Sequence, residues 1–302
     1  MMNIIGHKKI YLSFSVVLVI VSIVAIAVFG LKAGIDFTGG ALWQIRFSDP
    51  AVSEQSVVDY LKNKSNIEAV AYRETSSRSL LIKMQNVDEI RHQELLKEFT
   101  RTFGSVEELR FEAIGPAVGD QLRSKALWAI VLVLLGISVY IAISFRKVSF
   151  PVASWKYGTA TLIALLHDVI VPTGVIALLG YLKGVEMDSN FIVALLVIMG
   201  FSVHDTIVVF DRIRENLLSR RNQPFEEVVN ESVNQTMARS INTSLTLFLM
   251  LLVMLIVGAP SLRYFTLVLL IGTVIGTYSS IFIASPLLTI WYNFGRNKKT
   301  TK

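Results

Sequence analysis

The sequence contains no cysteine among its 302 residues. Disulfide bonds, thiol nucleophiles, thiolate metal sites and iron–sulfur clusters are therefore excluded within it. Charged side chains are also scarce, at 17% of the chain, whereas hydrophobic residues make up 53% and the mean hydropathy is +0.56. This composition is typical of a multi-spanning membrane protein.

Several enzyme motifs are missing as well. The sequence has no GxxxxGK[ST] loop for nucleotide phosphates, no HExxH zinc motif and no Gly-x-Ser-x-Gly elbow. We therefore expect neither an ATPase nor an intramembrane protease, no enzyme of another kind, no bound metal and no cofactor. The net charge of +6 sits mostly in short loops and the tail, so we expect no nucleic-acid partner.

Six apolar segments are long enough to cross a membrane, which takes about 20 mostly apolar residues. They cover residues 10–30, 126–145, 158–182, 190–210, 243–258 and 264–290. The first segment follows Lys8 and Lys9 but is too long for a typical signal peptide, and no A-x-A cleavage site follows it. It is interpreted as an uncleaved signal anchor.

Basic residues gather at alternate ends of these segments. They are Lys8, Lys9, Arg146, Lys147, Lys156, Arg212, Arg214, Arg220, Arg221, Arg239, Arg296, Lys298, Lys299 and Lys302. The opposite loops hold only Lys183 and Arg263. The positive-inside rule then predicts that both termini are cytoplasmic. It places segment 31–125 outside the cytoplasm, with the chain in the inner (plasma) membrane of the cell.

Segment 31–125 reads as a small soluble domain. The expected elements are a strand at 41–47, a helix at 52–64 with Ser53 as N-cap, strands at 67–74 and 79–84 joined through SSRS, a helix at 87–104 ending at Gly104, and a strand at 106–115. The order β-α-β-β-α-β predicts an α+β, ferredoxin-like domain. The expected organisation is therefore residues 1–30, the domain 31–125, and a bundle over 126–302.

Segment 211–242 is predicted to be a cytoplasmic loop. Within it, Phe225, Val228, Val229 and Val233 recur at helical spacing. This pattern predicts an amphipathic helix over 221–240 that lies on the membrane surface or against a partner.

The dipeptide His-Asp occurs inside two of the predicted spans, as His167–Asp168 and as His204–Asp205. A charged Asp at the centre of a span costs about 2.5–3.5 kcal/mol, so its presence needs a reason. Because the two spans run in opposite directions, the carboxyl groups lie within roughly 6–8 Å in depth and could form one polar cluster. Pro172 cannot donate to the carbonyl of Asp168, which predicts a kink beside it.

Two interpretations of these acids stay open. Asp168 and Asp205 form an ion or proton relay, or they only hydrogen-bond helices together. The relay is favoured, because ionisable residues inside membranes are functional by default. His167 and His204 are each rotated about 100° from the acid that follows, which favours interhelical contacts for each histidine alone. His204 is nevertheless included among the candidate relay residues.

Other features are weaker. Gly272, Gly276, Ser280 and Ala284 recur every four residues in the last span, a stripe that permits close helix contact. A charged group of residues follows the fourth span, and it is either a topological anchor or part of the relay. Its members are Asp211, Arg212, Arg214, Glu215 and Asn216.

GIDFTGG, residues 34–40, follows the first span. Asp36 is a candidate cap or gate, and Gly39 and Gly40 permit a sharp turn. A structural hinge and a functional element are equally supported here.

Several of these motifs together resemble the SecF family of protein-export membrane proteins, within the RND superfamily. They are GIDFTGG, LLHDVIV (165–171), GFSVHDTIVVFDRIREN (200–216), SINTSLTLF (240–248) and the glycine-rich last span. The resemblance covers essentially the whole chain. One departure is His204, where members of the family often carry Asn.

The resemblance implies half of a twelve-helix unit, with a SecD partner supplying the other six helices. It implies association with the SecYEG translocon, with YajC as a further partner and with unfolded preproteins in transit through the lipid bilayer. It implies that a proton or sodium gradient promotes late translocation. Asp168 and Asp205 match the ion path best, followed by Asp211 and Arg214. The alternatives are an RND-type exporter of lipids or small molecules and a non-conducting scaffold of the translocon.

Overall fold

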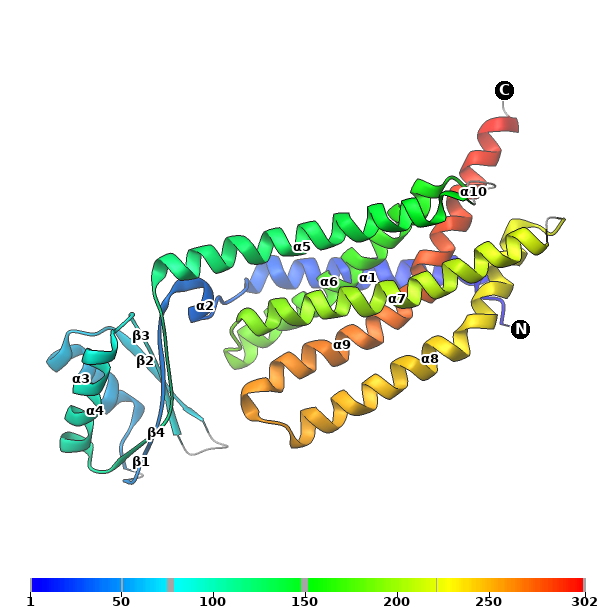
Figure 1. Cartoon of the computed structure of the whole chain (residues 1–302). Coiled ribbons are helices and arrows are strands. Elements are labelled where there is room, and N and C mark those ends of the chain that lie inside the picture. The colour runs from blue at the N-terminus through cyan, green and yellow to red at the C-terminus, as the bar shows by residue number, and fades with distance from the viewer. Residues whose placement is uncertain (1, 50, 75–78, 148–151, 221, 301–302) are drawn as a thin grey trace. The chain divides into compact units, whose positions relative to one another are not determined.

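The computed structural model describes residues 2–49, 51–74, 79–147, 152–220 and 222–300 (Figure 1). The chain divides into two compact units. Residues 33–127 form the α+β unit, and residues 1–32 with 128–302 form the helical unit. Residues 76–78 of the predicted SSRS linker, Arg221 and Lys302 lie outside the described residues, as do the side chains of Lys147 and residues 295–300.

The α+β unit contains the predicted β-α-β-β-α-β order. Its elements are α2 (Ile35–Thr38), β1 (Gly40–Phe47), α3 (Glu54–Ser65), β2 (Ala69–Glu74), β3 (Ser79–Met84), α4 (Glu89–Phe103) and β4 (Val106–Ile114). The strands form one sheet in the order β2-β3-β1-β4, and every neighbouring pair is antiparallel. This confirms the ferredoxin-like topology, in which the two crossover helices cover one sheet face.

The core of this unit is formed by every second side chain of β1. Ala41, Trp43 and Ile45 are fully buried, and they pack with Leu61 of α3 and Phe99 of α4. In a strand, every second side chain faces the same side, so these three residues line the helix-covered face.

The ends of α3 and α4 follow from capping residues. The backbone N–H of Ser56 donates to Ser53 Oγ at 3.1 Å, which confirms Ser53 as the N-cap of α3. Gly104 follows α4 with φ +84°, a conformation that ends a helix at little cost only for glycine.

The Gly39–Gly40 pair at the junction of α2 and β1 makes a tight turn. Gly39 has φ +71° and Gly40 has φ +128°. A Cβ on Gly39 would lie 2.8 Å from Pro116 Cα, and one on Gly40 would lie 2.9 Å from the Met84 carbonyl oxygen. Both conformation and space therefore demand glycine, which supports the structural interpretation of GIDFTGG. Asp36 lies in the first turn of α2, whose N-cap is Gly34.

The helical unit holds the membrane-spanning segments, except for the part of α5 up to Leu127, which belongs to the α+β unit. Six helical segments are long and apolar enough to cross a membrane, in agreement with prediction: Ile5–Phe29, Pro116–Ser144, Ser154–Lys183, Ser189–Ser219, Phe225–Val257 and Pro260–Phe294. They contain α1 (Lys8–Phe29), α5 (Pro116–Ser144), α6 (Ser154–Lys183), α7 (Ser189–Ser219), α8 (Phe225–Val257), α9 (Arg263–Ser279) and α10 (Ser285–Thr300). α5 begins ten residues before the predicted span, at Pro116, a residue whose fixed φ suits the first position of a helix.

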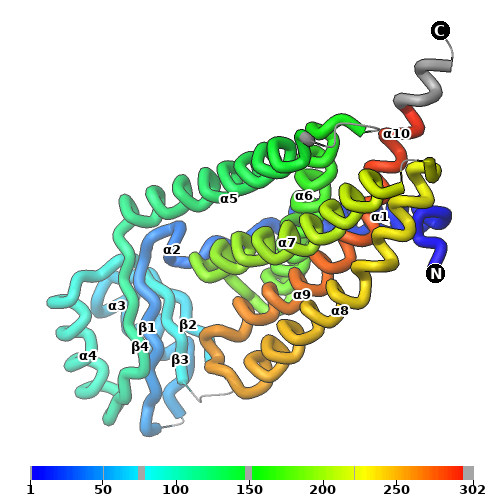
Figure 2. The backbone as a smooth tube through the Cα atoms, turned by 45° about the vertical axis from the view of Figure 1, so that its right-hand side comes forward, coloured from blue at the N-terminus to red at the C-terminus, as the bar shows by residue number. Residues whose placement is uncertain are grey.

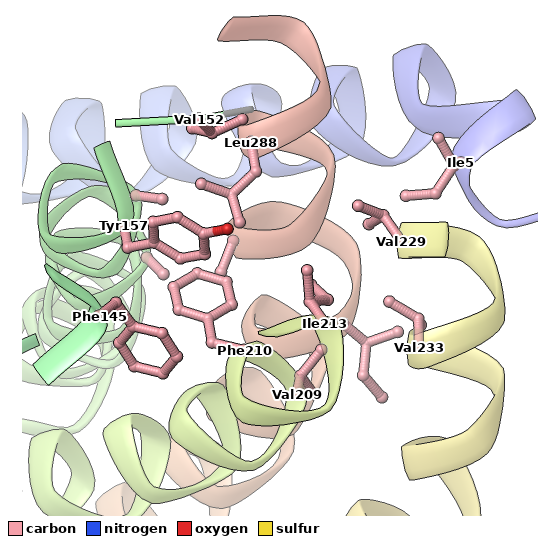
Figure 3. Packing of buried hydrophobic residues seen from close by; sticks show 14 of the residues in the cluster. Ile5, Phe145, Val152, Tyr157, Val209, Phe210, Ile213, Val229, Val233 and Leu288 are labelled. Carbon is pink, nitrogen blue, oxygen red and sulfur yellow. The ribbon is translucent and has the colours of Figure 1, made fainter. Parts of the chain in front are cut away.

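The segment predicted as a cytoplasmic loop, 211–242, is mostly helical, and its place on the cytoplasmic side stays a prediction. α7 extends to Ser219 and α8 begins at Phe225, so most of that segment continues the two membrane helices. The predicted amphipathic helix is the first part of α8. Its apolar face packs inside the chain rather than on a membrane or a partner, because Val229 and Val233 lie in one buried cluster with Ile5 and Ile213 (Figure 3).

The sixth span changes its winding in the middle. Residues Ser280–Ala284 form a π-helical turn between α9 and α10. Pro286 follows this turn, and proline lacks the N–H that an α-helix would direct to the carbonyl of Phe282. The π turn absorbs this mismatch, and such turns are frequent at functional sites.

Candidate functional site

Asp168 is completely buried where three helices of the bundle meet. Its helix, α6, packs against α7 and α9, which also pack against each other (Figure 2). Ser202 of α7 donates its Oγ proton to Asp168 Oδ2 at 2.5 Å, and Ser279 of α9 donates to the same oxygen at 2.6 Å. These two hydroxyls offset the cost of burying a carboxyl group, which is large when hydrogen bonds are missing.

Two glycines of α9 allow this close approach. A Cβ on Gly272 would collide with the side chain of Ile198, and one on Gly276 would lie 3.1 Å from Ser202 Cβ. The structure thus supports the packing role predicted for the small-residue stripe. Ser280 is also buried, and its Oγ donates to the Thr277 carbonyl at 3.0 Å where the π turn begins.

Asp205 is held by a second set of hydroxyls. It lies on α7 and is 7% exposed. Ser244 of α8 donates to Asp205 Oδ2 at 3.4 Å, and Thr277 of α9 donates to Ser244 Oγ at 2.5 Å. The carboxyl group therefore ends a chain of hydroxyls that crosses from α9 through α8.

A pocket opens beside Asp205. Its lining consists of Phe201, Ser202, His204, Asp205, Thr243, Ser244, Gly272, Thr273, Gly276 and Thr277. His204 is exposed, unlike its acidic neighbour. The structure thus provides Asp205 with a hydroxyl-rich, open environment.

The two carboxyl groups occupy adjoining sites. Among the described contacts, no hydrogen bond joins Asp168 to Asp205 directly. Ser202 connects the sites, because it donates to Asp168 and also lines the pocket of Asp205. The predicted polar cluster is therefore present as a sealed site and an open site that share one serine.

Pro172 lies in the middle of α6, and the helix is continuous from Ser154 to Lys183. Thr173 Oγ1 donates to the Val169 carbonyl at 2.7 Å, so a hydroxyl supports the backbone next to the proline. The helix is not interrupted, and the predicted kink stays a prediction.

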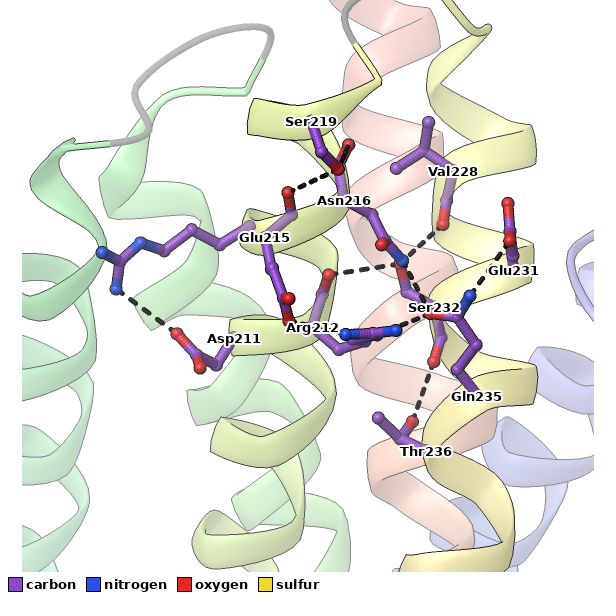
Figure 4. A network of polar contacts seen from close by, with 11 residues as sticks. Asp211, Arg212, Glu215, Asn216, Ser219, Val228, Glu231, Ser232, Gln235 and Thr236 are labelled. Atoms are coloured by element: carbon purple, nitrogen blue, oxygen red, sulfur yellow. Dashed lines mark hydrogen bonds and ion pairs between the residues drawn. The ribbon is translucent and has the colours of Figure 1, made fainter.

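Asp211 and Arg214 lie apart from these sites. Their recorded contact is with each other, at 3.3 Å on one exposed face of α7. A separate polar network joins the ends of α7 and α8, where Asn216 Nδ2 donates to Ser232 Oγ at 2.8 Å (Figure 4). An exposed ion pair of this kind contributes about 0–1 kcal/mol, so the geometry favours an anchor.

The sequence interpretation missed the hydroxyls that hold the acids. Ser202, Ser244, Thr277 and Ser279 are ordinary in composition, because serine and threonine occur throughout the apolar spans. The available signal was position, since Ser202 precedes Asp205 by nearly one helical turn and therefore lies on the same side of the helix. Within the described ranges, no three His, Asp or Glu side chains converge as metal ligands would.

Six apolar helices, with two carboxyl groups between them that accept hydrogen bonds from serine hydroxyls, define a multi-pass membrane protein of the transport class. Comparison with known families identifies it further. The family described as "Protein export membrane protein SecD/SecF, C-terminal" matches residues 94–294, and the "SecD/SecF GG Motif" matches residues 24–51. The chain belongs to the SecD/SecF family and has a role in Sec protein export.

Individual relatives agree with this assignment. The chain is 42% identical to "Protein translocase subunit SecF" of Thermobaculum terrenum, over 97% of this chain and 95% of the relative. It is 37% identical to the protein of the same name from Anaerolinea thermophila, over 96% and 94% of the two chains. These names describe translocase subunits, which implies a transport role.

Solved structures extend the comparison. The crystal structure of SecDF from Thermus thermophilus, a translocon-associated membrane protein, superposes with a TM-score of 0.81 at 34% identity. A structure of SecDF in a "Super-membrane-facing form" has a TM-score of 0.71 at 32% identity. The two comparisons cover 97% and 99% of this chain but only 39% and 40% of the SecDF chains, so this chain spans about two fifths of their length.

Proposed function

We propose that the chain is an ion-coupled subunit that uses a proton or sodium gradient to promote late translocation of preproteins through SecYEG. The observation that carries the proposal is Asp168, which is fully buried among apolar helices and bonded to serine hydroxyls. A hydroxyl can donate to a carboxylate and can accept from a carboxylic acid. The site therefore suits a group that gains and loses a proton or exchanges it for a cation.

The open pocket beside Asp205 supports the proposal that a partner subunit covers it. Asp205 and His204 line a pocket on the surface of the helical unit, whereas a finished ion path would be closed to lipid. Because the chain spans about two fifths of the solved SecDF chains, we propose SecD as the subunit that completes the bundle. YajC is proposed as a further partner on the resemblance alone.

The proposed topology follows from the distribution of basic residues. Both termini lie in the cytoplasm, the α+β unit lies outside it, and the membrane is the cell inner membrane. The α+β unit then meets the emerging preprotein on the side where late translocation occurs. The chain performs no catalytic chemistry of its own in this proposal, and its coupling ion is H⁺ or Na⁺.

Export in cells tests the proposal. Cells depleted of the native subunit are rescued with wild type, Asp168→Asn, Asp205→Asn or the control Asp59→Asn, an exposed aspartate of α3. We expect at least about 10-fold slower clearance of unprocessed precursor for Asp168→Asn and Asp205→Asn, because proton exchange at a relay group contributes about 10²–10⁴-fold. Asp59→Asn should behave as wild type.

Membrane amounts of each variant and of its partner are measured in parallel. Normal export by Asp168→Asn at normal abundance would contradict the ion-coupling proposal. It would leave a scaffold role, in which the buried acids only fasten helices together.

A further inference from the structure

His167 is the only recorded side-chain partner of the second oxygen of Asp168 among the described residues. Its Nδ1 lies 3.0 Å from Asp168 Oδ1, whereas the two serines occupy Oδ2. His167 is 4% exposed, so this contact is buried inside the helical unit. The expectation that His167 only makes an interhelical contact is therefore incomplete, because its direct partner is the neighbouring acid.

The other nitrogen of His167 has no partner. Nε2 is buried and lacks a hydrogen bond within the described part of the chain. Leaving a buried polar atom unpaired costs about 1–3 kcal/mol, and such atoms in folded proteins call for an explanation. A purely structural histidine would be expected to use both of its nitrogens.

The unpaired nitrogen has a chemical consequence. A neutral imidazole carries one proton, so one nitrogen donates and the other accepts. Beside an ionised Asp168, Nδ1 holds the proton and Nε2 is a bare acceptor. Beside a protonated Asp168 that donates to Nδ1, the imidazole proton sits on Nε2. The tautomer of His167 thus follows the protonation state of Asp168.

The surroundings of His167 place it away from the pocket of Asp205. Its ring stacks with Tyr278 of α9 at 6.3 Å between centroids. The Tyr278 hydroxyl accepts from Ser15 Oγ at 3.2 Å and donates to the Tyr11 carbonyl at 2.9 Å, both on α1. Among the recorded contacts of the described residues, Asp168 and Tyr278 are the titratable side chains that His167 meets.

Helix register supports the same placement. α1 and α6 run in the same direction (Figure 1), and a Cβ on Gly174 would lie 2.5 Å from Ser22 Cβ, so the helices touch there. His167 lies two turns before Gly174, and Ser15 lies two turns before Ser22. His167 therefore faces α1, whereas Ser202 on the other side of Asp168 faces the pocket.

We propose that His167 is the proton-transfer residue of Asp168 on the α1 side of the bundle, a role that rests on the proposed function. In the transfer, the Asp168 carboxylic acid gives its proton to Nδ1, and Nε2 releases its own proton to a water molecule. Asp168 becomes a carboxylate and His167 stays neutral with the opposite tautomer. The reverse sequence reloads Asp168, so one buried acid exchanges protons on two sides.

The first test compares substitutions in the export assay. His167→Asn keeps an amide N–H near the position of Nδ1 but removes Nε2, so it preserves the bond to Asp168 and blocks transfer. We expect gradient-dependent export at least about 10-fold slower than wild type, with unchanged thermal unfolding of the chain in detergent. The control His7→Asn changes an exposed histidine of the same unit and should export normally.

The second test reads the tautomer directly. The full chain has four histidines, so ¹⁵N-histidine NMR signals of the purified protein are assigned to His167 by their loss in His167→Asn. We expect the His167 proton to move from Nδ1 to Nε2 as falling pH protonates Asp168. A histidine whose tautomer stays fixed while Asp168 changes its protonation state could not pass the proton on.

The outcomes separate the two proposals. Normal export by His167→Asn, together with failed export by Asp168→Asn, would overturn the role of His167 and leave the ion-coupling proposal intact. An unchanging tautomer would also overturn it. Normal export by Asp168→Asn would overturn the ion-coupling proposal, and the role of His167 would fall with it.

Discussion

The two units of the chain hold their acidic side chains in different ways. On the surface of the α+β unit, carboxylates pair with arginine, as in Arg73–Glu54 and Arg46–Glu107, both at 2.8 Å. In the interior of the helical unit, Asp168 and Asp205 are bonded to serine hydroxyls instead. The glutamates on the α+β unit therefore have partners with a permanent positive charge. Asp168 and Asp205 instead have uncharged hydrogen-bond donors.

The difference has a chemical meaning. A guanidinium group stays charged at all relevant pH values and has no acceptor, so it suits only the carboxylate form. The pKa of Glu54 is correspondingly lowered, first by a backbone hydrogen bond at Glu54 and then by the Arg73 side chain. A serine hydroxyl fits the ionised and the protonated acid alike. Residues that must change protonation state are therefore better served by serine than by arginine.

Among the variants that test this comparison, removal of the serine donors should lower the folding free energy most. In the double variant Ser202→Ala and Ser279→Ala, Asp168 Oδ2 loses both recorded donors. We expect a loss of about 1–3 kcal/mol in folding free energy for each donor, because the buried oxygen is left unpaired. Thermal unfolding in detergent measures it, and Ser219→Ala, at an exposed serine, is the control.

A double-mutant cycle with Asp168→Asn sharpens this prediction. The amide keeps one acceptor oxygen but has no charge to stabilise, so serine removal should cost less in that background. Equal costs in the two backgrounds would show that the serines act through packing and that the carboxyl group does not need them.

Loss of the close contact between α9 and α7 should have the next largest effect. In Gly272→Ala, the new methyl group meets Ile198, and overpacking costs about 1–3 kcal/mol. Gly200→Ala on α7 is the matched control, because nothing lies within 4 Å of its Cβ position. We expect the control to be neutral or stabilised by up to about 1 kcal/mol, since alanine favours a helix over glycine. Equal unfolding temperatures for the two variants would contradict the packing role of Gly272.

The sequence was sufficient for the features that depend on local patterns. Alternation around Trp43, the cap at Ser53 and the glycine at Gly104 predicted the β-α-β-β-α-β order. Long apolar runs predicted six spans, because a membrane imposes a minimum helix length. These signals are read within one segment and need no knowledge of its neighbours.

The features that failed depend on contacts between segments. The helical spacing of Val229 and Val233 was correct, but their burial against Ile5 could not be seen from the spacing. Periodicity shows that a helix has an apolar face and does not say what covers it. Likewise, a serine in an apolar span gives no sign of which helix its hydroxyl reaches, so Ser279 was not connected with Asp168.

The smallest effect is expected at the paired acid Glu54. Its pKa in the folded chain lies below the usual 4.5, so its contribution to stability is present above pH 4.5 and is lost as pH falls through the folded-state pKa. Glu54→Gln should therefore weaken hydrogen-exchange protection of α3 slightly at neutral pH, by comparison with wild type at the same pH. The difference should vanish in acid, where wild-type Glu54 is also uncharged. A difference that persisted unchanged in acid would show that Glu54 acts through the shape of its contact with Arg73 rather than through its charge. Glu54 and the serine-bonded Asp168 would then differ in the geometry of their hydrogen bonds and not in the charge of their partners.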